Sequence, residues 1–329
     1  MPRSYWVETL GCPKNQVDSD KLIGTFAADG MVPADSADAA DLVVVNTCAF
    51  VEEAREESVA TILEVDAHRA EGSRLVVTGC MAERYGDELA RALPEVDAVA
   101  GFGVPVTLGR KPTGPTVPEL DLLNLPRPAS PRPWAYVKVA EGCDKACGFC
   151  AIPSFRGPQR SRDLASVLEE VDGLGVREVV LVAQDLAAYG RDGGRGERSI
   201  VPLVRAVAER VEWVRLLYLY PSELTDQLIH LMATGPVPYF DLSLQHVAAP
   251  LVRRMRRWGS GDKYLDRIGK IRAERPDAAF RSNFIVGYPG ETEEHHDQLL
   301  RFVEEAQLDW CGFFAYSPEE GTYAAGLDG

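Results

Sequence analysis

The sequence predicts an α/β protein with two domains, each built from strands that alternate with helices. Apolar runs with strand character and segments with helical periodicity follow one another along most of the 329 residues, and this alternation is typical of parallel sheets. A Pro-rich stretch that includes Lys111-Pro112-Thr113-Gly114-Pro115 interrupts the alternation. We therefore predict an N-terminal domain at 1–103, a linker at 104–133 and a second domain at 134–329.

The first domain is predicted to be a doubly wound parallel sheet. Strands are expected at 5–10, 42–46, 74–78 and 96–100, with helices at about 16–28, 51–68 and 83–93. The first strand–helix turn, Gly11-Cys12-Pro13-Lys14-Asn15, lacks the G-x-G-x-x-G spacing of dinucleotide-binding folds. The sheet therefore carries no nucleotide signature of that kind.

Three cysteines occupy equivalent positions in this domain. Cys12, Cys48 and Cys80 each come two residues after a predicted strand. Because the carboxyl ends of parallel strands line one edge of a sheet, the topology brings these three thiols together. Buried structural cysteines are the alternative, but three at equivalent positions favour a metal cluster site.

The second domain is predicted to be a partial barrel of six strand–helix units. Strands are expected at 134–140, 178–183, 213–218, 240–244, 279–286 and 310–315, and six are too few to close an eightfold barrel. Residues that bind ligands are expected at the carboxyl ends of these strands. Helices are expected to start near Asp163, Ser199, Leu224, Asp262 and Thr292.

The loop after the first of these strands contains a cysteine triad. Cys143, Cys147 and Cys150 stand in the run Cys143-Asp144-Lys145-Ala146-Cys147-Gly148-Phe149-Cys150. Thiolates suit iron–sulfur clusters and zinc. Three ligands leave one iron of a cubane open. A zinc site or a chance cluster is the alternative, but a fourth ligand at ordinary zinc spacing is missing, and His246 does not fit one.

Several other residues fall at predicted strand ends or in polar segments. Gln184-Asp185 and Gln245-His246 end two strands, where they either face a ligand or cap the loops. Cys311 is expected to be packed within a strand, and His295 and His296 to be solvated near the start of a helix. The run Arg253-Arg254-Met255-Arg256-Arg257 is most often a solvated helix face.

Charge and composition narrow the class of partner. The formal net charge is −15, and residues 1–103 alone carry 19 acidic against 8 basic side chains. An acidic surface repels a phosphate backbone, so direct nucleic-acid binding is not expected. We expect a basic protein partner instead. The sequence has no long apolar run and no signal peptide, so we predict a cytoplasmic protein without a membrane segment. The count of 7 cysteines is odd, and in a reducing compartment such cysteines are expected to be ligands and not disulfides.

The triad, with aromatic Phe149 just before its last cysteine, resembles that of the radical S-adenosylmethionine (SAM) enzymes. This resemblance implies a [4Fe-4S] cluster on the triad whose open iron binds SAM. The segment Phe284-Ile285-Val286-Gly287-Tyr288-Pro289-Gly290-Glu291 resembles the part of that family that packs against the adenine, where glycine permits close approach. The predicted SAM contacts are Phe149, Gln184, Gln245 and Gly287.

The whole chain resembles one subgroup, the radical SAM methylthiotransferases. That resemblance implies one [4Fe-4S] cluster on Cys12, Cys48 and Cys80 and a second on the triad. The motifs Gly11-Cys12-Pro13-Lys14-Asn15, Ala151-Ile152-Pro153-Ser154-Phe155-Arg156-Gly157 and Ser317-Pro318-Glu319-Glu320-Gly321-Thr322 resemble the RimO-type branch. The alternatives are the branch that modifies isopentenyladenosine in tRNA and a non-enzymatic iron–sulfur or zinc scaffold.

The RimO-type resemblance implies a reaction. One SAM methylates a sulfur at the first cluster, and a second SAM yields a radical that removes hydrogen from the β-carbon of an aspartate in the twelfth small-subunit ribosomal protein. No side chain is predicted to act as a catalytic acid or base. The redox count requires a one-electron donor such as flavodoxin or ferredoxin. Family members usually continue into a C-terminal β-barrel (TRAM) module, which this chain is expected to lack.

Overall fold

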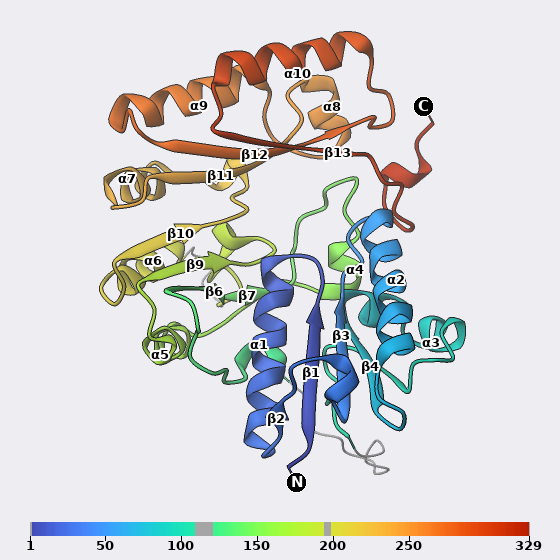
Figure 1. The fold of residues 1–329 in the computed structure, drawn as a ribbon. Helices are drawn as coiled ribbons and strands as arrows, with labels where there is room; N and C mark the ends of the chain where they lie inside the picture. The colour runs from blue at the N-terminus through green and yellow to red at the C-terminus, as the bar shows by residue number, and fades with distance from the viewer. Residues whose placement is uncertain (1, 109–120, 194–198, 329) are drawn as a thin grey trace. The chain divides into compact units, whose positions relative to one another are not determined.

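The computed structural model describes residues 2–108, 121–193 and 199–328 (Figure 1). It separates into two compact units, the first comprising Met1–Ala129 with Ser154–Arg156 and the second Ser130–Pro153 with Gly157–Gly329. Part of the predicted Pro-rich linker, including Lys111 to Pro115, lies outside the described residues. The domain limits 1–103, 104–133 and 134–329 therefore stay a prediction.

The first unit contains a five-stranded parallel sheet in the order β2-β1-β3-β4-β5. Helices follow three of its strands directly, which is the expected α/β alternation. The elements are β1 (Ser4–Thr9), α1 (Pro13–Ala28), β2 (Val32–Pro33), β3 (Leu42–Thr47), α2 (Glu52–His68), β4 (Arg74–Gly79), α3 (Cys80–Ala92) and β5 (Ala98–Ala100).

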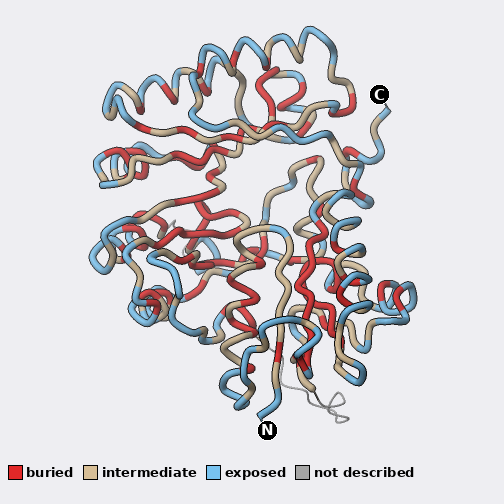
Figure 2. The backbone as a smooth tube through the Cα atoms, viewed as in Figure 1, coloured by how far each residue is buried: buried red, intermediate tan, exposed pale blue. Residues whose placement is uncertain are grey.

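Every residue of the central strand β3 is buried, and Figure 2 draws this strand in red. Val43 and Val45 belong to a core shared with Ile62 of α2. Leu42 and Val44 point to the opposite face, in a core shared with residues of α1. Alternate side chains of one strand therefore serve two layers of helices, and this explains why the strand is apolar at nearly every position.

The second unit contains two three-stranded parallel sheets, ordered β10-β9-β6 and β11-β12-β13. A parallel bridge between Leu219 and Leu242 connects β10 to β11, which gives the expected partial barrel of six strands. The strands are β6 (Trp134–Lys138), β9 (Glu178–Val182), β10 (Trp213–Leu216), β11 (Tyr239–Gln245), β12 (Ala279–Val286) and β13 (Trp310–Ala315), with a short antiparallel pair of β7 (Ala140–Glu141) and β8 (Arg160–Ser161).

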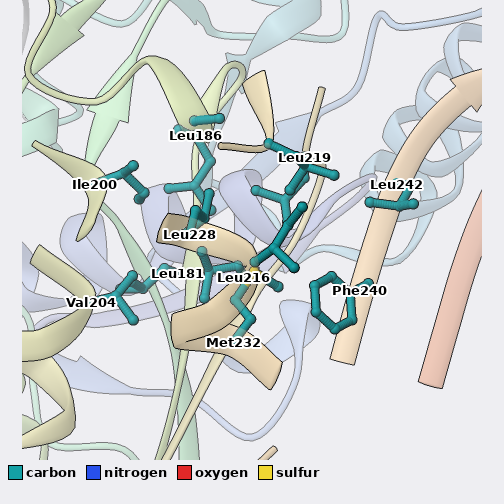
Figure 3. Close-up of a cluster of buried hydrophobic side chains, with 14 of the residues drawn as sticks. Leu181, Leu186, Ile200, Val204, Leu216, Leu219, Leu228, Met232, Phe240 and Leu242 are labelled. Atoms are coloured by element: carbon teal, nitrogen blue, oxygen red, sulfur yellow. The ribbon is translucent and has the colours of Figure 1, made fainter. Parts of the chain in front are cut away.

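Helices line the outside of these strands and enclose an apolar core. Figure 3 shows side chains of β9, β10 and β11 meeting those of α6 and α7, with Leu216 between Leu181 and Phe240. Burial of this layer is the main stabilising term of the unit. The helices are α5 (Leu164–Leu174), α6 (Ile200–Ala208), α7 (Asp226–Thr234), α8 (Ala249–Arg254), α9 (Gly261–Glu274) and α10 (Glu293–Ala306). The short helix α4 (Ile152–Arg156) ends in Ser154–Arg156, which belong to the first unit.

The α/β fold class is confirmed, but two helix starts differ from the prediction. Helix α1 starts at Pro13 and α3 starts at Cys80, each about three residues before the predicted position. Proline suits the first turn of a helix, because its missing N–H has no intrahelical partner there. The earlier starts place Cys12 and Cys80 on helix N-termini. Among the described residues no helix is both long and apolar enough to cross a bilayer.

Candidate functional site

The first candidate site lies at the carboxyl edge of the five-stranded sheet. Strands β1, β3 and β4 are neighbours, and their pairings Thr9 with Asn46 and Thr47 with Gly79 bring the strand ends level. Cys12, Cys48 and Cys80 follow these ends. They lie close enough that a charge on Cys12 or Cys80 raises the pKa of Cys48. The three thiols therefore lie near one another at this edge, as the parallel topology predicts.

Two glycines create the space for these thiols. A Cβ on Gly11 would lie 2.8 Å from Cys48 Cβ and 3.0 Å from Cys48 Sγ. A Cβ on Gly79 would lie 2.6 Å from the Thr47 carbonyl oxygen and would also collide with the Asn46 side chain. Both glycines have positive φ, +88° and +91°, which L-residues rarely adopt. The close approach of backbone to thiol thus depends on glycine at each position.

The Asn15 side chain connects the ends of the neighbouring strands. Its Nδ2 donates to the carbonyls of Leu10 and Thr47, each at 3.0 Å. Its Oδ1 accepts from Arg156 Nη2 at 2.9 Å and lies 3.5 Å from Cys80 Sγ. The side chain is completely buried, so these bonds compensate its lost hydration. Cys80 is thereby tied to the ends of β1 and β3.

The thiols of this site differ in electrostatic environment. Burial raises the pKa of Cys48 to about 11 and also raises the pKa of Cys80, although Arg156 opposes it there. Burial acts on Cys12 in the same direction, but Lys14, nearby backbone amides and Arg156 together bring its pKa below the ordinary value. Binding a metal would therefore require proton release from at least Cys48 and Cys80.

The second candidate site is the loop of the cysteine triad, between β7 and α4. The Gly148 N–H donates to the Met255 carbonyl at 2.8 Å, and the Gly148 carbonyl accepts from the Ala324 N–H at 2.7 Å. Within the loop, the Lys145 N–H donates to Cys143 Sγ at 3.4 Å. The loop is therefore fixed by the end of α8 and by the C-terminal segment of the same unit.

Two thiols of the triad, Cys143 and Cys150, also have raised pKa values. Burial raises the pKa of Cys143 to about 11 and that of Cys150 to about 12. Arg257 Nη1 donates to Cys147 Sγ at 3.2 Å, and its guanidinium lies 4.1 Å from the centroid of the Tyr220 ring. A cation placed beside thiols favours their thiolate form.

A network of charged side chains borders the triad at the strand ends. Lys145 Nζ forms an ion pair with Glu223 and lies 3.5 Å from Asp185 Oδ2. Gln184, at the end of β9, donates to Glu141 Oε1 at 2.6 Å, and Glu141 Oε2 pairs with Lys138 Nζ at 2.7 Å. Burial raises the pKa of Asp185, which Lys145 opposes. Asp185 is thus part of this charged network and does more than cap a loop.

The remaining predicted cofactor contacts are placed as follows. Phe149 packs against an apolar cluster that includes Met255 and Tyr288. Gln245 ends β11 with φ of 71°, and Gly287 follows β12 with φ of 74°. A Cβ on Gly287 would meet no atom within 4 Å among the described residues, so its backbone borders open space. Their role in SAM binding stays a prediction.

Histidines and the seventh cysteine have structural roles. Buried His246 accepts the Ala248 N–H at 3.1 Å through Nδ1 and faces Glu291 at 3.3 Å through Nε2, so it is bonded to the backbone just before α8. His295 completes a capping box with Thr292 at the start of α10. Cys311 lies in β13 and packs against the barrel core.

One prediction from the sequence is wrong. The basic run from Arg253 to Arg257 does not form one solvated helix face, because α8 ends at Arg254 and Arg257 turns toward Cys147. The sequence also did not single out Arg156, Lys145 or Glu223 as site residues. Arg156 and Lys145 stand inside motifs that the sequence did identify, but a long side chain's partner depends on tertiary structure.

Among the described residues, no group of three His, Cys, Asp or Glu side chains is arranged as the ligands of a single metal ion are.

Comparisons with known families divide the chain in the same way. Residues 4–101 match the uncharacterized protein family UPF0004, and residues 137–303 match the radical SAM superfamily. Among solved structures, the cobalamin-bound radical SAM methyltransferase TsrM of Kitasatospora setae aligns with a TM-score of 0.57 at 15% identity, covering 98% of this chain and 77% of that one. OxsB, a cobalamin-dependent SAM radical enzyme, also aligns at 0.57, with 11% identity, over 98% of this chain and 54% of its own. These structures support the fold alone.

Curated relatives are more specific. The ribosomal protein uS12 methylthiotransferase RimO of Moorella thermoacetica is 46% identical over 98% of this chain and 78% of the relative. The proteins of the same name from Sorangium cellulosum and Kineococcus radiotolerans are 44% and 43% identical, covering 98% and 99% of this chain and 70% and 77% of the relatives. Together with the two cysteine sites, these matches establish that the chain belongs to the RimO family of radical SAM methylthiotransferases.

Proposed function

We propose that the protein adds a methylthio group to the β-carbon of an aspartate in ribosomal protein uS12. The observation that carries the proposal is the pair of three-cysteine sites in a chain that matches RimO proteins over 98% of its length. The net charge of −15 favours a basic ribosomal protein over the phosphate backbone of tRNA. Because the substrate belongs to the ribosome, we also propose a cytoplasmic location.

Each proposed cofactor has a set of residues to hold it. Cys12, Cys48 and Cys80 would hold one [4Fe-4S] cluster, and the triad Cys143, Cys147 and Cys150 a second. When bound, the clusters and SAM supply the sulfur-transfer centre and the radical that activates an unreactive C–H bond. Phe149, Gln184, Gln245 and Gly287 are proposed to contact SAM.

The protein's own residues prepare these sites. Burial keeps several thiols protonated until iron arrives, so each cluster binds with release of protons. Arg156 and Arg257 each donate an N–H to one cysteine sulfur, which compensates negative charge as thiolates form. Lys145 holds the carboxylates of Asp185 and Glu223 beside the triad and limits the repulsion between them.

A one-electron donor such as flavodoxin or ferredoxin is the further partner that we propose.

The identity of the modified substrate distinguishes the two branches of the family. The reconstituted protein would be incubated anaerobically with SAM, sulfide and reductant, with uS12 in one reaction and isopentenyladenosine-containing tRNA in another. We expect the mass of one methylthio group on a single aspartate of uS12 and none on an aspartate-to-alanine variant. Modified tRNA with unmodified uS12 would overturn the proposal.

A further inference from the structure

Arg156 is a buried cation at the edge of the first cysteine site. Its side chain is 2% exposed, although it stands six positions after Cys150 in the sequence. It belongs with Ser154 and Phe155 to the first compact unit, and Phe155 packs against that unit's core. A guanidinium is costly to bury unless its charge and its N–H groups are compensated.

Groups of the first unit provide compensation of this kind. Arg156 Nη2 donates to Cys80 Sγ at 2.9 Å and to Asn15 Oδ1 at 2.9 Å. Its Nη1 lies 3.2 Å from Asp18 Oδ2, and its Cζ lies 3.9 Å above the centroid of the Phe102 ring. Asp18 is itself 1% exposed at its side chain. One buried carboxylate and one cysteine sulfur therefore share one buried cation.

The contact of Arg156 with both Cys80 and Asp18 affects the energy of the site once the cysteines are thiolates. Arg156 places its positive charge 2.9 Å from Cys80 Sγ, and Asp18 places a carboxylate 3.2 Å from the same guanidinium. Both charges are fixed in a poorly hydrated place, where Coulomb interactions are stronger than in water. A cluster bound to thiolates gains one further negative charge on reduction, so a nearby cation favours the reduced form and a nearby anion opposes it.

We propose that Arg156 is a positioning residue that holds Cys80 in place and raises the reduction potential of the first cluster. Asp18 has the opposite effect and lowers this potential. Hydrogen bonds to cysteine sulfur are a recognised means by which proteins set such potentials. The inference rests on the proposed function in one respect, that Cys80 ligates a cluster. It predicts opposite effects for two residues that contact each other.

The test isolates the first cluster by changing Cys143, Cys147 and Cys150 to alanine in the full chain. In that background, the potential is measured by electron paramagnetic resonance at stepped potentials. Arg156→Gln should disfavour the reduced form about tenfold, a downward shift of about 59 mV for a one-electron couple. Asp18→Asn should shift the potential upward, and Arg156→Lys, which keeps the charge, should remain nearer the parent value than Arg156→Gln.

Two controls separate this role from a structural one. Arg69→Gln removes another largely buried arginine of the same unit, paired with Asp66 and Asp97 at 2.8 and 2.7 Å, and should leave the potential unchanged. In the complementary background, with Cys12, Cys48 and Cys80 changed to alanine, Arg156→Gln should leave the second cluster's potential unchanged. A purely structural role would change iron content without opposite shifts for Arg156 and Asp18.

The outcomes distinguish the inference from the proposed function. If the background variant binds about four irons and neither Asp18→Asn nor Arg156→Lys follows the predicted pattern, the inference is wrong while the cluster assignment stands. If that variant is folded and binds no iron, the assignment of Cys80 as a ligand fails first. Should Arg156→Gln lose its iron, the upward shift of Asp18→Asn decides, because its absence overturns the inference.

Discussion

The two cysteine sites are built in opposite ways. Cys12 and Cys80 are 68 positions apart and meet because three neighbouring strands end at one sheet edge. Cys143 and Cys150 are only seven positions apart in a single loop, which main-chain bonds fix to Met255 and Ala324. The first site is a product of topology, and the second a product of local spacing. Damage to the sheet should therefore affect the first site selectively.

The largest expected effect separates the jobs of the two sites. Fully reconstituted protein should hold about eight irons, and alanine at all three cysteines of either site should leave about half. Without the triad, SAM cleavage to 5′-deoxyadenosine and methylthio transfer should both stop. Without Cys12, Cys48 and Cys80, cleavage should continue under strong reductant while transfer stops.

Chromatography of 5′-deoxyadenosine in the two triple variants measures this division. Normal cleavage by the triad variant would contradict it. So would the absence of cleavage in a folded first-site variant that retains its second cluster. Circular dichroism of both variants serves as the control for folding.

A smaller but selective effect is expected from Gly79→Ala. A methyl group there meets the Thr47 carbonyl at 2.6 Å, and φ of +91° adds backbone strain, a cost of about 1–3 kcal/mol before the collision is counted. Iron at the first site should fall while the triad keeps its cluster. Gly72→Ala is the matched control, because φ there is +81° but no described atom lies within 4 Å of the added Cβ. Equal iron loss in both variants would refute the steric explanation.

A third comparison uses pH to test how buried His246 affects the stability of the second unit. Burial holds the pKa of His246 below its ordinary value, although Glu291 opposes it. The unfolded chain therefore binds a proton more readily than the folded one, so stability falls as pH drops below about 6.5 toward the folded pKa. His246→Gln should reduce this acid sensitivity in thermal unfolding of the second unit. Exposed His230→Gln, whose partner is Glu274, is the control, and an equal reduction there would contradict the role of His246.

The smallest effect is expected from Cys311→Ser. Cys311 lies in β13 and packs on the barrel core, so iron content at both sites and methylthio transfer should stay close to those of the parent. Iron analysis and uS12 mass spectrometry check this together. Loss of four irons on this change alone would show that a ligand has been misassigned.

The sequence predicted the parts of the fold that depend on local pattern. The longer strands of both units, including the buried β3 and β4, follow from their apolar runs and the turns between them. The two-residue strands β2, β7 and β8 were not predicted, because so short a segment carries no periodic pattern. The convergence of Cys12, Cys48 and Cys80 followed from parallel topology alone. Contacts of Arg156 and Arg257 could not be predicted, because long flexible side chains reach partners far away in the sequence. The space at Gly11 and Gly79 likewise depends on neighbouring strands.

The return of Ser154–Arg156 to the first unit has a consequence for biosynthesis. The ribosome makes the five strands of that unit well before it makes these three residues. Domains generally fold as units during synthesis, with the N-terminal one first, yet this one lacks Arg156, the cation beside Cys80, until residue 156 has left the exit tunnel. By then the triad has also been made. A fragment ending at Ala129 would therefore contain every cysteine of the first site and still be an incomplete version of it.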